Sequence, residues 1–224
     1  MIAAKTLTFL RDLAKHNTKE WVDDHRDAYD GAVEDLTQLA ARLLGAADQF
    51  DDRIGKNAID PAKAVSRLHR DMRFQKGKPP YKTDWFVTIG EDAQSRGPAG
   101  YYVHVQPGNC YVGGGIFSPP PELLGHIRDR ISSHYDQWRR IVENPDLLKL
   151  IDGGLTSPET LKTKPRGYDA DDPSADYLRM KGFCANRSLT HRQIESDEGF
   201  ALTVEAFNAI RPLVDFINEA GLRR

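Results

Sequence analysis

The sequence predicts a single α+β domain over residues 1–224, with an antiparallel sheet at about residues 64–115 packed by N- and C-terminal amphipathic helices. Apolar residues recur at helical spacing in both end regions, whereas in the middle region they alternate with polar ones. Helices followed by strands and then by helices favour the α+β class over repeating βαβ units.

The N-terminal region predicts a long amphipathic helix. Asn17 and Glu20 have the spacing of a capping box, which satisfies free N–H groups at a helix start. We therefore expect a helix from there to about Ala47. Its apolar stripe consists of Trp21, Val22, Tyr29, Val33, Leu36, Leu39, Leu43 and Leu44.

The middle region has the period of two that is typical of strands. A first strand is predicted over residues 64–74, where one parity is shared by Leu68, Arg70, Met72 and Phe74. Further strands are predicted from Trp85, from Tyr101, and after the turn at Pro107. Gly113, Gly114 and Gly115 mark either a bend or the floor of a ligand site.

The C-terminal region predicts more helices around an irregular segment. Ser118, followed by Pro119, is a candidate cap. Residues 152–189 are rich in Gly, Pro and Asp and predict irregular structure. Thr190 and Gln193 form another capping-box candidate, and Pro212 is expected to kink or restart the last helix.

Bulk composition excludes several classes of protein. The chain is 39% hydrophobic and 29% charged, and it has no apolar run of the ~20 residues that a membrane helix needs. Two distant cysteines, Cys110 and Cys184, predict free thiols and a cytoplasmic location. A pI near 6.4 disfavours a protein that coats DNA.

The charge is nevertheless uneven. Residues 63–82 carry seven bases and one acid, a local charge of +6 in a chain of net charge −2. We call residues 70–82 the basic segment. Its candidates for ligand binding are Arg70, Arg73, Lys78, Tyr81 and Lys82, and Arg67, just before the segment, is a further candidate. Arginine forks and lysine point charges suit phosphate, sulfate or carboxylate.

Two interpretations of Arg70 remain open at this stage. Its parity places it with apolar neighbours, where a lone charge is costly. The partner is therefore either a carboxylate of the protein or an anionic ligand.

Lys164 and Tyr168, in a second basic stretch, are candidates to close the same site. Asp71 and His104 are the candidates for proton transfer. Histidine and cysteine spacings match no metal motif, and no phosphate-binding or dinucleotide-binding glycine loop occurs, so no metal or cofactor is predicted.

The central motif resembles the R-x-x-R-D-x-R-F-x-K-x-K-x-P-Y-K-T signature of the DUF2461 family. It is formed here by Arg67, Arg70-Asp71, Arg73-Phe74, Lys76, Lys78 and Pro80-Tyr-Lys-Thr83. Residues 6–29, 100–108, 115–117 and 161–173 are also similar to that family. Gln75 and Gly77 depart from its usual Ser and Asp. The resemblance implies one α+β domain in which the central bases and the second loop act together, but it implies no reaction.

Three classes of function follow. The first is an anion-binding cleft for a phosphorylated or acidic small molecule, with or without catalysis. The second is a nucleic-acid module that stacks bases on Tyr81, Trp85, Tyr101 and Tyr102. The third is a scaffold that grips an acidic partner or a second copy, since the sequence leaves the oligomeric state open.

Overall fold

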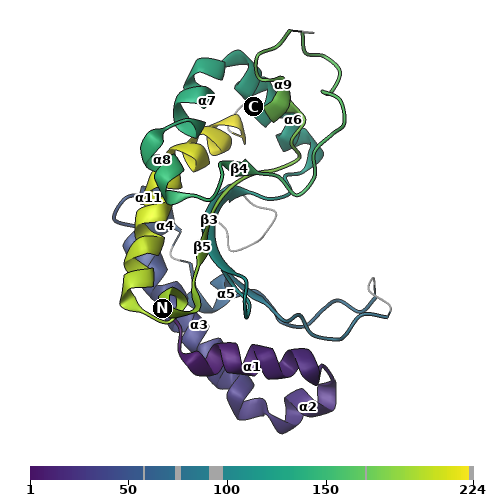
Figure 1. The fold of residues 1–224 in the computed structure, drawn as a ribbon, viewed down its shortest axis with the longest axis vertical. Helices are drawn as coiled ribbons and strands as arrows, with labels where there is room; N and C mark the ends of the chain where they lie inside the picture. The colour runs from purple at the N-terminus through teal and green to yellow at the C-terminus, as the bar shows by residue number, and fades with distance from the viewer. Residues whose placement is uncertain (58, 74–76, 91–97, 170, 222–224) are drawn as a thin grey trace.

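The computed structural model describes residues 1–57, 59–73, 77–90, 98–169 and 171–221, and it confirms the α+β class (Figure 1). Its helices are α1 (Ala4–Lys15), α2 (Lys19–Asp24), α3 (Arg26–Ala47), α4 (Asp52–Lys56), α5 (Pro61–Ala64), α6 (Pro121–Ser133), α7 (Tyr135–Val142), α8 (Pro145–Leu150), α9 (Ala175–Leu178), α10 (His191–Ile194) and α11 (Asp197–Gly221). Its strands are β1 (Trp85–Ile89), β2 (Gly100–Val105), β3 (Cys110–Ile116), β4 (Leu155–Thr156) and β5 (Phe183–Leu189). Within the described ranges, no helix has the length and apolar character needed to cross a membrane.

The strands form one antiparallel sheet in the order β1-β2-β3-β5-β4. The strands predicted from Trp85, from Tyr101 and after Pro107 are confirmed as β1, β2 and β3. The irregular structure predicted for residues 152–189 is wrong in part, because β4 and β5 lie there and β5 pairs with β3 along its whole length. The sequence FCANRSL of β5 mixes small and polar residues on both faces, so it lacks the alternation that identifies a strand.

The strand predicted over residues 64–74 is also wrong. α5 ends at Ala64, and isolated bridges join the following residues, one from Val65 to Val87 and one from His69 to Tyr81. Phe74 lies outside the described residues. This part of the chain borders the sheet without extending it.

The N-terminal helix is divided and starts one residue later than predicted. The cap of α2 is Thr18, whose Oγ1 accepts a hydrogen bond from the backbone N–H of Trp21 at 3.2 Å. α2 ends before His25, where α3 takes over. Asn17 is therefore not the cap, and its side chain bonds elsewhere.

The later helix ends agree only in part with the sequence. The N-cap of α6 is Pro120 rather than Ser118, and no side chain caps it. The capping box of Thr190 and Gln193 is confirmed at α10. α11 continues through Pro212, so this residue does not divide the helix.

The core lies on one face of the sheet. α11 packs along β3 and α3 packs against β1, and Figure 1 shows α11 (yellow) on one side of β3 and β5. The buried strand residues on that face include Trp85, Val87, Ile89, Tyr101, Val103, Val105, Cys110, Val112, Ile116, Phe183, Ala185 and Leu189. We call the opposite face the outer face, and its residues include Phe86, Thr88, Tyr102, His104, Tyr111, Gly113, Gly115, Cys184, Asn186 and Ser188.

A buried ionic network joins α4, β2 and α11. Asp51 is 2% exposed and accepts hydrogen bonds from Arg53 Nε at 2.7 Å, Arg53 Nη2 at 2.6 Å and the Tyr101 hydroxyl at 2.9 Å. Arg53 Nη2 also lies 2.6 Å from Asp215 Oδ1. Burial alone would raise the pKa of Asp51, but the hydrogen bonds from Arg53 and Tyr101 outweigh it and hold that pKa below its usual value.

Candidate functional site on the outer face

Four rings gather on the outer face where β1, β2 and β3 lie side by side. His104 is at the centre, with its ring centroid 4.6 Å from that of Phe86 and 4.4 Å from that of Tyr111. Tyr102 completes the cluster at 6.2 Å from Phe86 and 6.3 Å from Tyr111. His104 is 5% exposed, whereas the other three rings are half-buried. The result is an aromatic surface with a polar centre.

Both ring nitrogens of His104 face acceptors. Nδ1 lies 2.9 Å from the Asn109 carbonyl oxygen, and Nε2 lies 3.5 Å from Asp84 Oδ2. A ring nitrogen can donate to either acceptor only when it carries hydrogen. The two contacts fix the orientation of the ring between the Asn109 carbonyl and the Asp84 carboxylate.

Asp84 also connects the rings to the basic segment. The hydrogen bond from His104 is the main cause that holds the pKa of Asp84 below its usual value; burial opposes this shift, and the charges of Lys82 and Arg70 add to it. The charges of two of the predicted bases are therefore felt at a carboxylate that contacts the ring cluster. Sequence reasoning missed Asp84, although it precedes Phe86 by two positions and so shares its parity.

The basic segment is anchored to the N-terminal helices. The Arg70 backbone N–H donates to the Pro80 carbonyl at 2.9 Å. Asn17 engages both backbone groups of Tyr81, because its Nδ2 donates to the carbonyl and its Oδ1 accepts from the N–H, each at 3.0 Å. Arg70 Nε donates to the same carbonyl at 3.2 Å.

The other predicted residues of this segment do not converge on the rings. Arg67 and Lys78 are exposed. Asp71 accepts hydrogen bonds at both oxygens from Arg73, at 2.9 and 2.7 Å, on the surface. Tyr81 is 3% exposed, so it anchors the segment and is not open to a ligand.

Lys164 and Tyr168 lie in a different place. Lys164 Nζ donates to the Tyr168 carbonyl at 2.9 Å, and the Tyr168 hydroxyl donates to Asp129 Oδ1 of α6 at 2.8 Å. Figure 1 shows the segment that contains them (green) beside α6 and α9, well away from residues 65–83. The structure therefore does not bring these two residues to the basic segment.

A chain of polar side chains continues the outer face toward β4. The Tyr102 hydroxyl donates to Asn186 Oδ1 at 2.6 Å, and Asn186 Nδ2 donates to Thr156 Oγ1 at 2.9 Å. A Cβ atom at Gly113 would lie 2.9 Å from the Tyr102 hydroxyl and 2.5 Å from the Ala185 carbonyl oxygen. Gly113 is therefore required by close packing, which favours the structural interpretation of this glycine.

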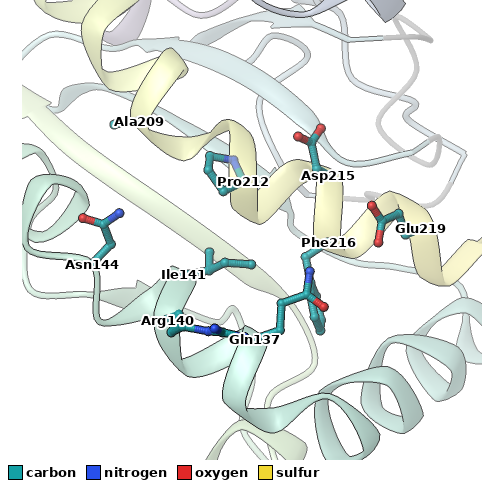
Figure 2. Close-up of a pocket in the computed structure, with 9 residues that line it drawn as sticks. All are labelled: Gln137, Arg140, Ile141, Asn144, Ala209, Pro212, Asp215, Phe216 and Glu219. Atoms are coloured by element: carbon teal, nitrogen blue, oxygen red, sulfur yellow. The ribbon is translucent and has the colours of Figure 1, made fainter.

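A separate cavity of about 340 Å³ lies between α7 and α11 (Figure 2). Its walls are formed by Gln137, Arg140, Ile141, Asn144, Ala209, Pro212, Asp215, Phe216 and Glu219. Asp215 is already paired with Arg53 and, at 3.4 Å, with Arg211, and Glu219 is paired with Arg130. Since its carboxylates are paired within the protein, we do not place the functional site here.

The chain thus belongs to the class of α+β proteins with a five-stranded antiparallel sheet that is covered by helices on one face. Residues 5–216 match the model of the family described as Conserved hypothetical protein (DUF2461). The match spans most of the chain, so the chain belongs to this family, and the resemblance noted in the sequence is confirmed. No curated protein and no solved structure matches it.

Proposed function

We propose that the outer face binds a small anionic ligand that carries a flat unsaturated group. The observation that supports this most directly is Asp84, whose carboxyl group lies 3.5 Å from Nε2 of His104 in the ring cluster and whose pKa is lowered further by the charges of Lys82 and Arg70. A ligand placed here meets positive charge and aromatic surface together. Phosphate or carboxylate on a ring has that combination of chemistry.

The net charge of the proposed site indicates the charge of the ligand that it would bind. Arg70 and Lys82 contribute two positive charges and Asp84 one negative charge, so the site without His104 has a net charge of about +1. The site therefore suits a monoanion or a dianion better than a polyanion.

Binding is better supported than proton transfer by His104. Its nitrogens already face Asn109 and Asp84. A general base must be able to reach the proton of the substrate, so a ligand would first have to displace Asp84. We assign His104 to positioning Asp84 and the rings, and we place no catalytic role on the exposed Asp71.

The test is calorimetric titration and thermal shift with phenyl phosphate, benzoate and inorganic phosphate, on the wild type and on Lys82→Ala and Tyr111→Leu. The exposed Lys149→Ala is the matched control. Phenyl phosphate at a hundred times its Kd should add about 2.7 kcal/mol, or about 5–10 °C in Tm for a chain of this size. Lys82→Ala should weaken both phosphates, whereas Tyr111→Leu should weaken only phenyl phosphate. Equal binding by all variants would refute the proposal.

A second candidate is single-stranded nucleic acid, because half-buried rings on a sheet can stack bases. The rings named for this from the sequence are mostly unsuitable: Tyr81, Trp85 and Tyr101 are buried, and only Tyr102 lies on the outer face. An affinity that rises with oligonucleotide length and falls steeply with salt would favour this candidate. If no probe binds, concentration-dependent mass in solution would favour the scaffold.

A further inference from the structure

The cavity between α7 and α11 has opposite charges on its two walls (Figure 2). Arg140 and the amide side chain of Gln137 come from α7, whereas Asp215 and Glu219 come from α11. The two carboxylates are four positions apart, so they lie on the same face of their helix. Phe216 and other apolar side chains complete the lining.

Both carboxylates remain accessible although each is paired. Asp215 is paired with Arg53 and Arg211. Glu219 is paired with Arg130. None of these three arginines lines the cavity, and the side chains of Asp215 and Glu219 are 38% and 51% exposed. The ion pairs therefore leave part of each carboxylate open to a ligand.

The electrostatic surroundings of Asp215 favour one more positive charge. The pKa of its carboxyl group is raised above the usual value, mainly by burial, and the negative charges of Asp51 and Glu219 add to this shift. The charges of Arg53 and Arg211 oppose the shift but do not cancel it. A cation bound in the cavity would stabilise the ionised carboxylate.

Arg140 supplies the positive charge of the opposite wall. Its Nε donates to the Asp136 carbonyl one turn earlier on α7, at 3.2 Å, which orients the guanidinium along the helix. Among the residues that the structure describes, no carboxylate lies within ion-pair distance of Arg140. Arg140 and Gln137 also line an adjoining cavity of about 650 Å³, which gives a longer ligand room to extend.

From this arrangement we infer that the cavity binds a small zwitterion, an amino acid or a short peptide with free ends. The ammonium group is held at Asp215 and Glu219, and the carboxylate at Arg140, by charge-assisted hydrogen bonds. A dipeptide spans about 7 Å, and a volume of about 340 Å³ is typical of small-molecule sites. The site is separate from the one proposed beside Lys82, because α11 covers the face of the sheet opposite to the outer face (Figure 1).

The test follows the indole N–H signal of Trp138 in ¹⁵N-labelled full-length protein at pH 7. Trp138 reports on the cavity because its ring packs against Phe216, with the ring centroids 5.1 Å apart. The probes are alanyl-alanine, its N-acetyl derivative, which lacks the ammonium, and its C-terminal amide, which lacks the carboxylate. We expect alanyl-alanine to shift the signal with saturation, and each capped probe to have a Kd about tenfold higher or more. Tighter binding of free alanine would support the same class of ligand, with an amino acid as its source.

Three variants make the outcome decisive. Arg140→Gln should bind alanyl-alanine about tenfold more weakly and lose the preference over the amide. The exposed Arg139→Gln, whose side chain lines neither cavity, and Lys82→Ala should both bind like the wild type. If the Trp138 signal does not move, if either capped probe binds as tightly as alanyl-alanine, or if Arg140→Gln binds like the wild type, the inference is overturned.

Discussion

Asn17→Ala removes the clamp that holds the basic segment to the N-terminal helices. In the wild type the Asn17 side chain donates to the Tyr81 carbonyl and accepts from the Tyr81 N–H, at 3.0 Å each. The carbonyl keeps a second donor, Arg70 Nε at 3.2 Å. The Tyr81 N–H has no second acceptor among the described residues, so most of the lost stability comes from this unpaired N–H.

The magnitude follows from these contacts. Leaving the Tyr81 N–H without a hydrogen-bond acceptor costs about 1–3 kcal/mol. The lost bond to the Tyr81 carbonyl adds about 1 kcal/mol or less, because Arg70 still donates to that carbonyl. We expect a loss of about 2–3 kcal/mol in the free energy of unfolding, which lowers Tm by about 4–12 °C in a chain of this size.

Urea unfolding followed by circular dichroism measures the loss, and hydrogen exchange locates it at the amide of Tyr81. Asn57→Ala is the matched control, because the Asn57 side chain makes one exposed bond, to the Arg53 carbonyl at 3.2 Å. We expect the control to change stability by less than about 0.5 kcal/mol. Equal losses in the two variants, or unchanged exchange at Tyr81, would contradict the reasoning.

Three further predictions concern the sheet and its charges. Arg53→Met leaves a buried carboxylate uncompensated and should cost about 3 kcal/mol in urea unfolding, the low end of the range because Arg53 is a quarter exposed; the exposed Arg139→Met should be near neutral. Because the pKa of Asp84 is depressed, its contribution is present above the unfolded pKa of about 3.9 and lost as pH falls through the folded value. Asp84→Asn should therefore lose less Tm than the wild type between pH 5 and pH 2, and equal losses would refute this. Gly113→Ala should lower stability by about 1–3 kcal/mol because its Cβ meets backbone at 2.5 Å, whereas Gly125→Ala in α6, with open space around it, should raise it by about 0.5–1 kcal/mol.

The parts of the fold that local patterns determine were predictable. Trp85, Val87 and Ile89 alternate strictly, so β1 and the inward face of its neighbours could be read from the sequence. The same parity placed His104 opposite Tyr101. β5 escaped prediction because β3 and α11 bury its small residues whatever their period.

Contacts distant in sequence account for most of the remaining differences. Asn17 and Thr18 both suit a helix cap, and the bond from Asn17 to Tyr81, 64 positions away, decides between them. The density of positive charge in the sequence identified the basic segment, but it could not show which of its bases belong to the proposed ligand site. Arg73 bonds Asp71 two positions away, whereas Lys82 gains significance only through its place beside Asp84.

The clamp at Asn17 also bears on the proposed ligand site, because Lys82 follows the residue that Asn17 holds. If Asn17→Ala loosens this backbone, ligand binding must first order about one residue, which costs about 1–2 kcal/mol, or a roughly 5- to 30-fold loss of affinity. No ligand contact is removed, so such a loss would show that the clamp preorganises Lys82. Asn57→Ala is the reference, since its side chain makes an exposed bond away from the clamp. Weaker binding in Asn17→Ala alone indicates local loosening, whereas equal losses of affinity in both variants would refute a specific link between Asn17 and the ligand.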